Sequence, residues 1–184
     1  MEDEPLVRRI LDGDNSGFDA LLDMYQERVY RLAYRMVGVS DAEDVTQETF
    51  VAIYKSLTSF RGQAKLSTWV YRVTVNTCLT WRRRQRPEEV SLLDDFEVAD
   101  DRYDVEKQAL RLLGQERVEQ ALDELDEAHR LPVILHELHG LTYREIAETM
   151  QIPIGTVKSR LFHAFKLLRR ALKDTVAEAT YNET

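Results

Sequence analysis

The sequence predicts an all-α protein made of two small helical domains joined by a flexible acidic linker, with a helix-turn-helix in the C-terminal domain. Apolar residues recur at spacings of three and four on both sides of the linker, and no pair of alternating apolar and polar runs flanks an Asn-Gly or Asp-Gly turn. The length of 184 residues allows one ordinary domain or two small ones, but not a large multi-layer enzyme.

Charge is sorted along the chain, and this sorting predicts the domain boundaries. The formal net charge is -8, yet residues 61–87 carry seven basic and no acidic side chains, and residues 142–173 carry seven basic and two acidic ones. Residues 88–106 hold nine acidic side chains against one basic and few apolar anchors, which is typical of a linker. We therefore expect domains over residues 1–87 and 107–184, each with its own basic contact to a polyanion.

The composition argues against several classes of protein. No apolar stretch approaches the roughly 20 residues of a membrane helix, and the acidic start Met1-Glu2-Asp3-Glu4 is unlike a secretory signal, so we expect a cytoplasmic protein. With one cysteine, Cys78, and four histidines, neither an internal disulfide nor a cysteine-rich zinc site is expected. No grouping of nucleophile, base and oxyanion donors indicates catalysis, so we expect no enzyme activity, no metal and no cofactor.

Two helices are predicted to open the N-terminal domain. The first runs from Pro5 to near Gly13, and the second runs from about Ser16 to Val37, where Gly38 suits a left-handed cap.

The third predicted helix, from a capping box at Ser40–Glu43 to about Phe60, has two contrasting faces. Small and apolar side chains at helical spacing form one of them: Ala42, Val45, Thr49, Ala52, Ile53 and Ser56. The other is mostly polar and consists of Asp41, Asp44, Gln47, Glu48, Val51 and Lys55. Taken alone, this second face is most simply a solvated surface.

The fourth predicted helix, from about Leu66 to Arg84, is apolar nearly all round, so other elements should cover it on both sides. The longer segment from Arg61 to Arg86 alternates seven cations with Trp69, Tyr71 and Trp81, and no acidic residue interrupts it. Two interpretations remain open. Rings between cations suit single-stranded DNA, because rings stack on bases while Lys and Arg hold the backbone. Alternatively, the tryptophans anchor the core, as we expect of Trp81 in particular.

Beyond the linker, helices are predicted from about Val105 to Leu125 and from Asp126 to His139, the latter ending at Gly140. Pro132 would cost about 3 kcal/mol in the middle of a helix, so we expect a kink there or a later start.

A helix-turn-helix is predicted over residues 141–173. A capping box at Thr142–Glu145 begins its first helix, a tight turn spans residues 151–155, and Thr156 is expected to cap the second helix. The second helix has an inward apolar stripe at Val157, Leu161, Ala164, Leu168 and Leu172. Its opposite face presents Ser159, Phe162, His163, Lys166 and Arg170, with Lys158, Arg160 and Arg169 at the flanks. Such a face suits a DNA major groove, and a merely solvated helix pair is the alternative.

Two sets of residues resemble a known family. Residues 41–50, Phe60-Arg61-Gly62, residues 67–73 and Asn76 resemble the second conserved domain of the extracytoplasmic function sigma factors of bacterial RNA polymerase. Residues 138–147 and 152–161 resemble the fourth domain of the same family. The resemblance covers nearly the whole chain, in the family's order and with a linker of the family's length.

The resemblance implies three contact surfaces. The coiled coil of the largest polymerase subunit would bind Asp41, Asp44, Gln47, Glu48 and Val51. The -10 element of the promoter would be melted, with one base flipped, by Arg61, Lys65, Ser67, Thr68, Trp69, Tyr71, Arg72 and Asn76. The -35 element would be read by Arg144, Thr156, Lys158, Ser159, Arg160, Phe162, His163 and Lys166. Because many members carry arginine where this chain has His163, the base contact there is expected to be weaker or pH-sensitive.

The sequence is therefore interpreted as an alternative sigma factor, with core RNA polymerase and promoter DNA as partners and an anti-sigma protein, often membrane-bound, as its restraint. The alternative is a stand-alone helix-turn-helix repressor or activator, which would need dimer symmetry to bind two half-sites. No coiled-coil heptad is visible to provide that symmetry, so we expect a monomer when the protein is free. A helical adaptor with no DNA role would leave the two acid-poor segments unexplained.

Overall fold

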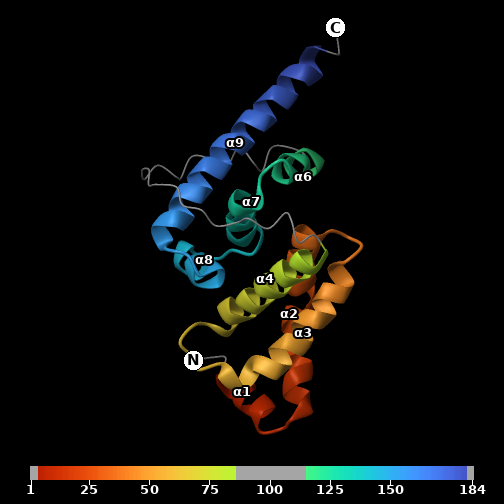
Figure 1. Ribbon diagram of the computed structural model, residues 1–184, viewed down its shortest axis with the longest axis vertical. Helices are drawn as coiled ribbons and strands as arrows, with labels where there is room; N and C mark the ends of the chain where they lie inside the picture. The colour runs from red at the N-terminus through yellow and green to blue at the C-terminus, as the bar shows by residue number, and fades with distance from the viewer. Residues whose placement is uncertain (1–3, 86–114, 182–184) are drawn as a thin grey trace. The chain divides into compact units, whose positions relative to one another are not determined.

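The computed structural model describes residues 4–85 and 115–181, and within these ranges every regular element is a helix, which confirms the all-α class (Figure 1). The helices in chain order are α1 (Glu4–Leu11), α2 (Asn15–Val37), α3 (Ala42–Ser56), a 3-10 turn (Leu57–Ser59), α4 (Leu66–Gln85), α6 (Gln115–Asp123), α7 (Glu127–Val133), a π turn (Ile134–Leu138), α8 (Tyr143–Met150) and α9 (Ile154–Tyr181).

The chain divides into two compact units, Met1–Ser91 with Glu145–Gln151 and Leu92–Arg144 with Ile152–Thr184. The predicted acidic linker, residues 88–106, lies outside the described residues, and so do the boundaries predicted on either side of it. These boundaries stay predictions.

The start of α2 is built by a carboxylate cap. Asp14 accepts a hydrogen bond from the backbone amide of Ser16 at 2.9 Å and another from Nε of Arg9 on α1 at 3.0 Å. Hydrogen bonds from the side chain of Ser16 and then from Arg9 hold the pKa of Asp14 below its ordinary value. At the other end, the amide of Gly38 donates to the carbonyl of Tyr34, and Gly38 adopts the positive φ of 86° that the sequence predicted for a glycine cap.

The predicted capping box at the start of α3 is not the arrangement in the structure. The helix begins at Ala42 with Asp41 at the N-cap, and the Asp41 side chain makes no capping bond. Its Oδ2 instead accepts a hydrogen bond from Nε1 of Trp81 on α4 at 3.0 Å. Asp41, and not the predicted Ser40, is therefore the N-cap residue, and its carboxylate is used in a contact with α4. The helix α3 ends at Ser56 rather than near Phe60.

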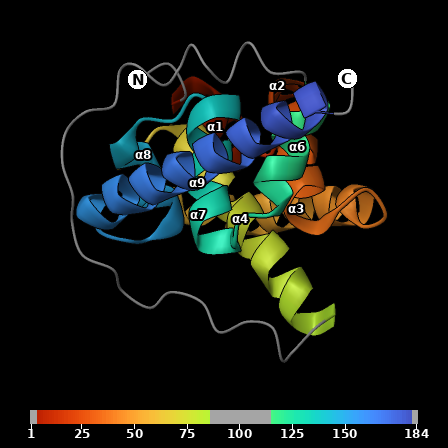
Figure 2. The same ribbon diagram turned by 90° about the horizontal axis from the view of Figure 1, so that it is seen from above.

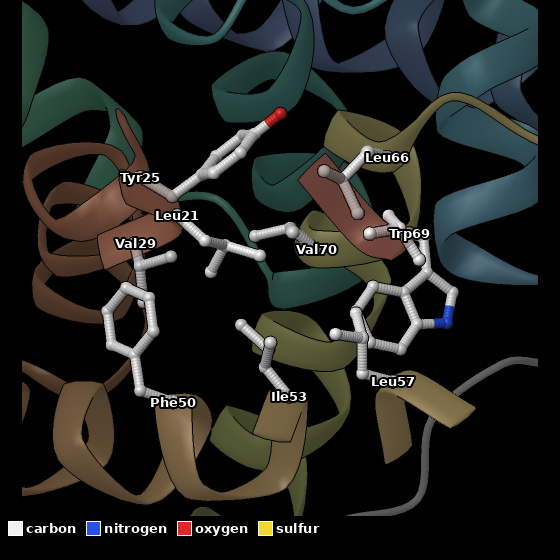
Figure 3. Packing of buried hydrophobic residues seen from close by; sticks show 10 residues of the cluster. Leu21, Tyr25, Val29, Phe50, Ile53, Leu57, Leu66, Trp69 and Val70 are labelled. Atoms are coloured by element: carbon white, nitrogen blue, oxygen red, sulfur yellow. The ribbon is translucent and has the colours of Figure 1, made fainter. Parts of the chain in front are cut away.

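The core of the first unit lies where α2, α3 and α4 pack together (Figure 3). Figure 3 shows Leu21 and Val29 of α2 facing Ile53 of α3 and Val70 of α4, and all four side chains are fully buried. The buried residues of α4 run round its circumference: Leu66, Thr68, Trp69, Val70, Tyr71, Thr74, Val75, Thr77 and Cys78. This confirms the prediction that α4 is covered on more than one side.

In the second unit, α6 and α7 lie beside α9 (Figures 1 and 2). The predicted inward stripe of α9 is buried at all five positions. Apolar residues of α6, α7 and the π turn are buried as well: Ala121, Leu122, Leu131, Val133, Ile134 and Leu135. The helix periodicity read from the sequence therefore identifies the buried face of α9 correctly.

The structure shows an irregularity near Pro132, but not a later helix start. Asp126 caps α7 by accepting a hydrogen bond from the amide of His129 at 2.9 Å, so the helix begins at Glu127 with Pro132 inside it. Proline has no amide hydrogen, which removes one intrahelical bond, and the ladder widens into the π turn Ile134–Leu138 directly afterwards. Gly140, at φ 69°, then ends this segment as predicted.

Candidate functional site

The helix-turn-helix consists of α8 and α9 joined by three residues. Gln151 takes a positive φ of 56°, which turns the chain after Met150. Thr156 is not the cap of α9, contrary to the prediction. The helix begins at Ile154, and the amide of Val157 donates to the carbonyl of Pro153 at 3.2 Å, which places Thr156 within the first turn.

The outward face of α9 is smaller than the sequence indicated. Lys158 and Lys166 are exposed and Phe162 and His163 are partly exposed, but Ser159 and Arg160 are only 2% and 7% exposed. The hydroxyl of Ser159 donates back to the carbonyl of Thr156 at 3.0 Å, so this short side chain does not project.

Arg160 illustrates how narrow the outward face is. It lies about 60° round the helix from Val157, at the edge of the buried stripe, because three residues advance an α-helix by about 300°. The described surface available to a groove therefore centres on Lys158, Phe162, His163 and Lys166, with Arg144 exposed on α8.

The basic segment of the first unit contains both exposed and buried members. Arg61, Lys65 and Asn76 are exposed, and Ser67 and Arg72 are partly exposed. Thr68, Trp69 and Tyr71 are buried, at 3%, 5% and 3% exposure. Three of the eight residues predicted at the -10 element thus lack the surface that a base contact needs.

The aromatic rings of this segment belong to the packing of the unit. Trp69 lies 5.5 Å from the ring of Phe60 and belongs to the same core cluster as Leu57 and Leu66 (Figure 3). Burial raises the pKa of the Tyr71 hydroxyl, and the nearby Arg28 of α2 opposes part of that shift. The interpretation of the rings as core anchors is therefore the one that the structure favours for Trp69 and Tyr71.

The polar face of α3 is partly occupied by α4. Asp44, Gln47 and Val51 are exposed, as expected. Asp41 is bonded to Trp81, however, and Oε1 of Glu48 accepts a hydrogen bond from Nη1 of Arg84 at 2.9 Å. Two of the five residues predicted to bind polymerase thus already hold the C-terminal end of α4.

Beside this face, a groove of about 510 Å³ lies between α2 and α3, lined by Phe18, Leu22, Gln26, Thr46, Gln47, Phe50, Val51 and Tyr54. Tyr54 is 60% exposed and Val51 is 51% exposed, and the ring of Tyr54 meets that of Phe18 edge to face at 5.2 Å. Tyr54 was not among the residues predicted to lie at this face. Its signal was present, because Tyr54 follows Val51 by three residues and Gln47 by seven and so shares their side of the helix.

Two further observations concern the described ranges alone. None of the helices in those ranges combines the length and the hydropathy that a membrane span requires. No group of three or more His, Cys, Asp or Glu side chains there lies close enough together to hold a metal ion.

Comparison with known proteins identifies the class. Residues 21–88 match the family Sigma-70 region 2, and residues 115–168 match Sigma-70, region 4. The chain is 36% identical to an ECF RNA polymerase sigma-E factor of Haemophilus influenzae, over 94% of this chain and 96% of the relative. It is also 36% identical to an RNA polymerase sigma-H factor of Pseudomonas aeruginosa, over 97% of both chains.

The fold agrees with this class. The sigma factor RpoE of Bartonella quintana, solved in a co-crystal with the anti-sigma factor NepR, matches with a TM-score of 0.65 and 22% identity, over 85% of this chain and 96% of that chain. The two matched regions define a sigma factor of the sigma-70 superfamily. The chain belongs to the extracytoplasmic function sigma factors, and it is an alternative sigma factor that directs transcription initiation, as the sequence-based interpretation held.

Proposed function

We propose that the chain binds core RNA polymerase through α3 and its groove, contacts the -10 element through the loop before α4 and the exposed part of that helix, and reads the -35 element through α9. The observation that carries this proposal is the sorting of side chains on α9. Its apolar stripe is fully packed, whereas Lys158, Phe162, His163 and Lys166 remain at the surface. The exposed part of this set is the surface that we assign to DNA.

The chemistry of the outward face of α9 suits duplex DNA. Lys158 and Lys166 are suited to pair with phosphates or to donate hydrogen bonds to the N7 and O6 acceptors of guanine, and the ring of Phe162 offers apolar contact to a thymine methyl group. The imidazole ring of His163, which lies between Lys158 and Lys166 in the sequence, can form hydrogen bonds to a base. Ser159 and Arg160, being buried, are left out of the proposed surface.

In the first unit, we assign the -10 contact to the exposed or partly exposed polar side chains of the segment: Arg61, Lys65, Ser67, Arg72 and Asn76. The cations among them hold the phosphate backbone, while Ser67 and Asn76 offer hydrogen bonds to an unstacked base. The buried Trp69 and Tyr71 support this surface from beneath, because they fix the helix that carries it.

The polymerase contact combines apolar and acidic groups. Val51 and Tyr54 supply apolar area at the rim of the groove, and Asp44 and Gln47 supply polar contacts beside them. Buried aromatic anchors dominate the affinity of most protein interfaces, so Tyr54 is expected to matter more than the acids. Asp41 and Glu48 act through α4, which they hold in place.

A restraining partner follows by analogy. The Bartonella quintana sigma factor of the same fold was solved with an anti-sigma factor bound, and we infer that an anti-sigma protein also binds this chain and hides its DNA and polymerase surfaces. The chain would act in the cytoplasm as a monomer, without a cofactor, and its role in initiation would be non-catalytic.

The test is run-off transcription with sigma-free core polymerase on a random promoter library, with and without the protein. Transcripts that depend on the protein and share two upstream elements are the expected result. Lys158→Ala should weaken the sequence preference at the upstream element. The matched control Arg8→Ala, which removes an exposed cation on α1, should leave that preference unchanged. An absence of dependent transcripts together with tight binding to a symmetric duplex would instead support a stand-alone repressor.

A further inference from the structure

Three aromatic rings connect α7 to the outward face of α9. The ring of His129 on α7 lies 6.3 Å from that of His163 on α9, at an interplanar angle of 84°. The ring of His163 lies in turn 5.5 Å from that of Phe162, at 81°. Both contacts are edge to face, a geometry that favours defined ring orientations. His129 belongs to none of the three predicted contact surfaces.

His129 is itself held at two points by Asp126. The carboxylate accepts one hydrogen bond from the backbone amide of His129 at 2.9 Å, and Nδ1 of the ring lies 2.8 Å from Oδ1 and 2.9 Å from Oδ2. Partial burial acts to raise the pKa of Asp126, but the amide and the ring of His129 together bring that pKa below its ordinary value.

The protonation state of Asp126 determines the tautomer of its partner. An ionised carboxylate only accepts hydrogen bonds, so Nδ1 of His129 must carry the hydrogen. A ring whose tautomer and orientation are both fixed in this way is a rigid support for whatever packs against it.

We propose that His129, held by Asp126, positions the imidazole of His163 for its base contact in the -35 element. This proposal rests on the proposed reading of that element by α9. His129 is a positioning residue, because it acts through His163 and not through DNA. Without the support of His129, the ring of His163 would sample several rotamers, and its preference for one base would weaken.

The test selects -35 sequences from a random library with the polymerase holoenzyme, using the full chain. His163→Ala should lose base preference at one position or two adjacent ones. His129→Ala should reduce the preference at the same position by about two- to tenfold, and the double variant should lose no more than His163→Ala, since residues that act as a unit are non-additive.

Two further variants separate positioning from stability. His129→Asn retains a hydrogen-bond donor for Asp126 but lacks the ring, so its preference profile should match that of His129→Ala even where the latter folds poorly. Arg130→Ala removes a neighbouring α7 side chain that pairs with Asp123 at 3.5 Å, so it should affect stability alone and leave base preference unchanged. The imidazole ¹⁵N chemical shifts of the wild-type protein should show that His129 carries its hydrogen on Nδ1. Asp126→Ala should abolish this preference for the Nδ1–H tautomer.

The outcomes are distinguishable. An altered preference in His163→Ala with wild-type preference in both His129 variants would overturn the positioning role and leave the proposed function intact. An unchanged preference in His163→Ala would overturn it as well, because there would be no base contact to position. If the wild-type protein selects no -35 sequence at all, the reading of that element by α9 fails, and the inference fails with it.

Discussion

Replacing Trp69 by alanine tests whether this ring is a core anchor or a DNA contact. Trp69 is 5% exposed and packs in the cluster that includes Leu57, Leu66 and Val70 (Figure 3). A buried tryptophan removes about 150–250 Å² from water, which at about 25 cal/mol per Å² corresponds to about 4–6 kcal/mol as an upper bound. Measured Trp→Ala losses in cores are about 3–5 kcal/mol. We therefore expect Trp69→Ala to lower the folded-to-unfolded ratio at least a hundredfold.

The assay is urea unfolding of the full chain followed by tryptophan fluorescence. Both tryptophans, Trp69 and Trp81, lie in the first unit, so this signal reports that unit alone, and Trp81 remains as the reporter in the variant. Val51→Ala is the matched control for stability, because Val51 is 51% exposed and surface changes of this kind stay within about 0.5 kcal/mol. Trp69→Phe keeps an aromatic ring against Phe60, so its free energy of unfolding should fall much less than that of Trp69→Ala.

One result would refute the reasoning. If Trp69→Ala unfolds at the same urea concentration as the wild-type protein, and yet permanganate footprinting shows that the promoter stays closed, the ring acts on DNA and not in the core. Promoter opening that falls only in proportion to the unfolded fraction is the expected outcome.

The other predictions concern the remaining surfaces. Asp126→Ala should destabilise the second unit by about 0.5–2 kcal/mol through loss of the α7 cap, whereas Asp126→Asn should keep the cap. Folding lowers the pKa of Asp126, so its ionised form stabilises the folded state. This stabilisation is complete above the unfolded pKa of about 3.9 and is lost as the pH falls through the folded pKa. The melting temperatures of the wild-type protein and Asp126→Asn should therefore converge at low pH. Val51→Ala should weaken core polymerase binding by about 1–2 kcal/mol in an anisotropy titration, and an unchanged affinity would remove Val51 from the interface. Lys158→Ala should reduce the slope of log K for promoter binding against log salt concentration by about 0.9 in magnitude, whereas Arg8→Ala should not change this slope.

The helices were largely predictable because their signals are local. The apolar spacing in α9 identified its buried stripe, and the glycines at positions 38 and 140 end their helical segments with positive φ, as their place after the last apolar residues predicts. The errors in helix boundaries concern which residue caps a helix. Asp41, and not Ser40, is at the N-cap of α3, where its side chain bonds to Trp81. The helix α9 begins at Ile154, before Thr156.

The exposure of the candidate site residues was only partly predictable. Charge counts and motif spacing led to the prediction of which segments contact DNA and polymerase. They did not show that Ser159 and Arg160 are buried on α9, or that Glu48 pairs with Arg84. They also missed Tyr54, whose exposure depends on how α2 packs against α3.

By itself, the sequence determined the all-α class, the separation into two basic segments and the sigma-factor family, because helix periodicity, charge and motif order are properties of neighbouring residues. Only the tertiary structure decided that Trp69 and Tyr71 are core residues and that His129 contacts His163. Whether a ring is buried, or which ring it meets, depends on helices that are distant along the chain but adjacent in space. The same cation-rich and aromatic pattern is compatible with either outcome until those helices pack.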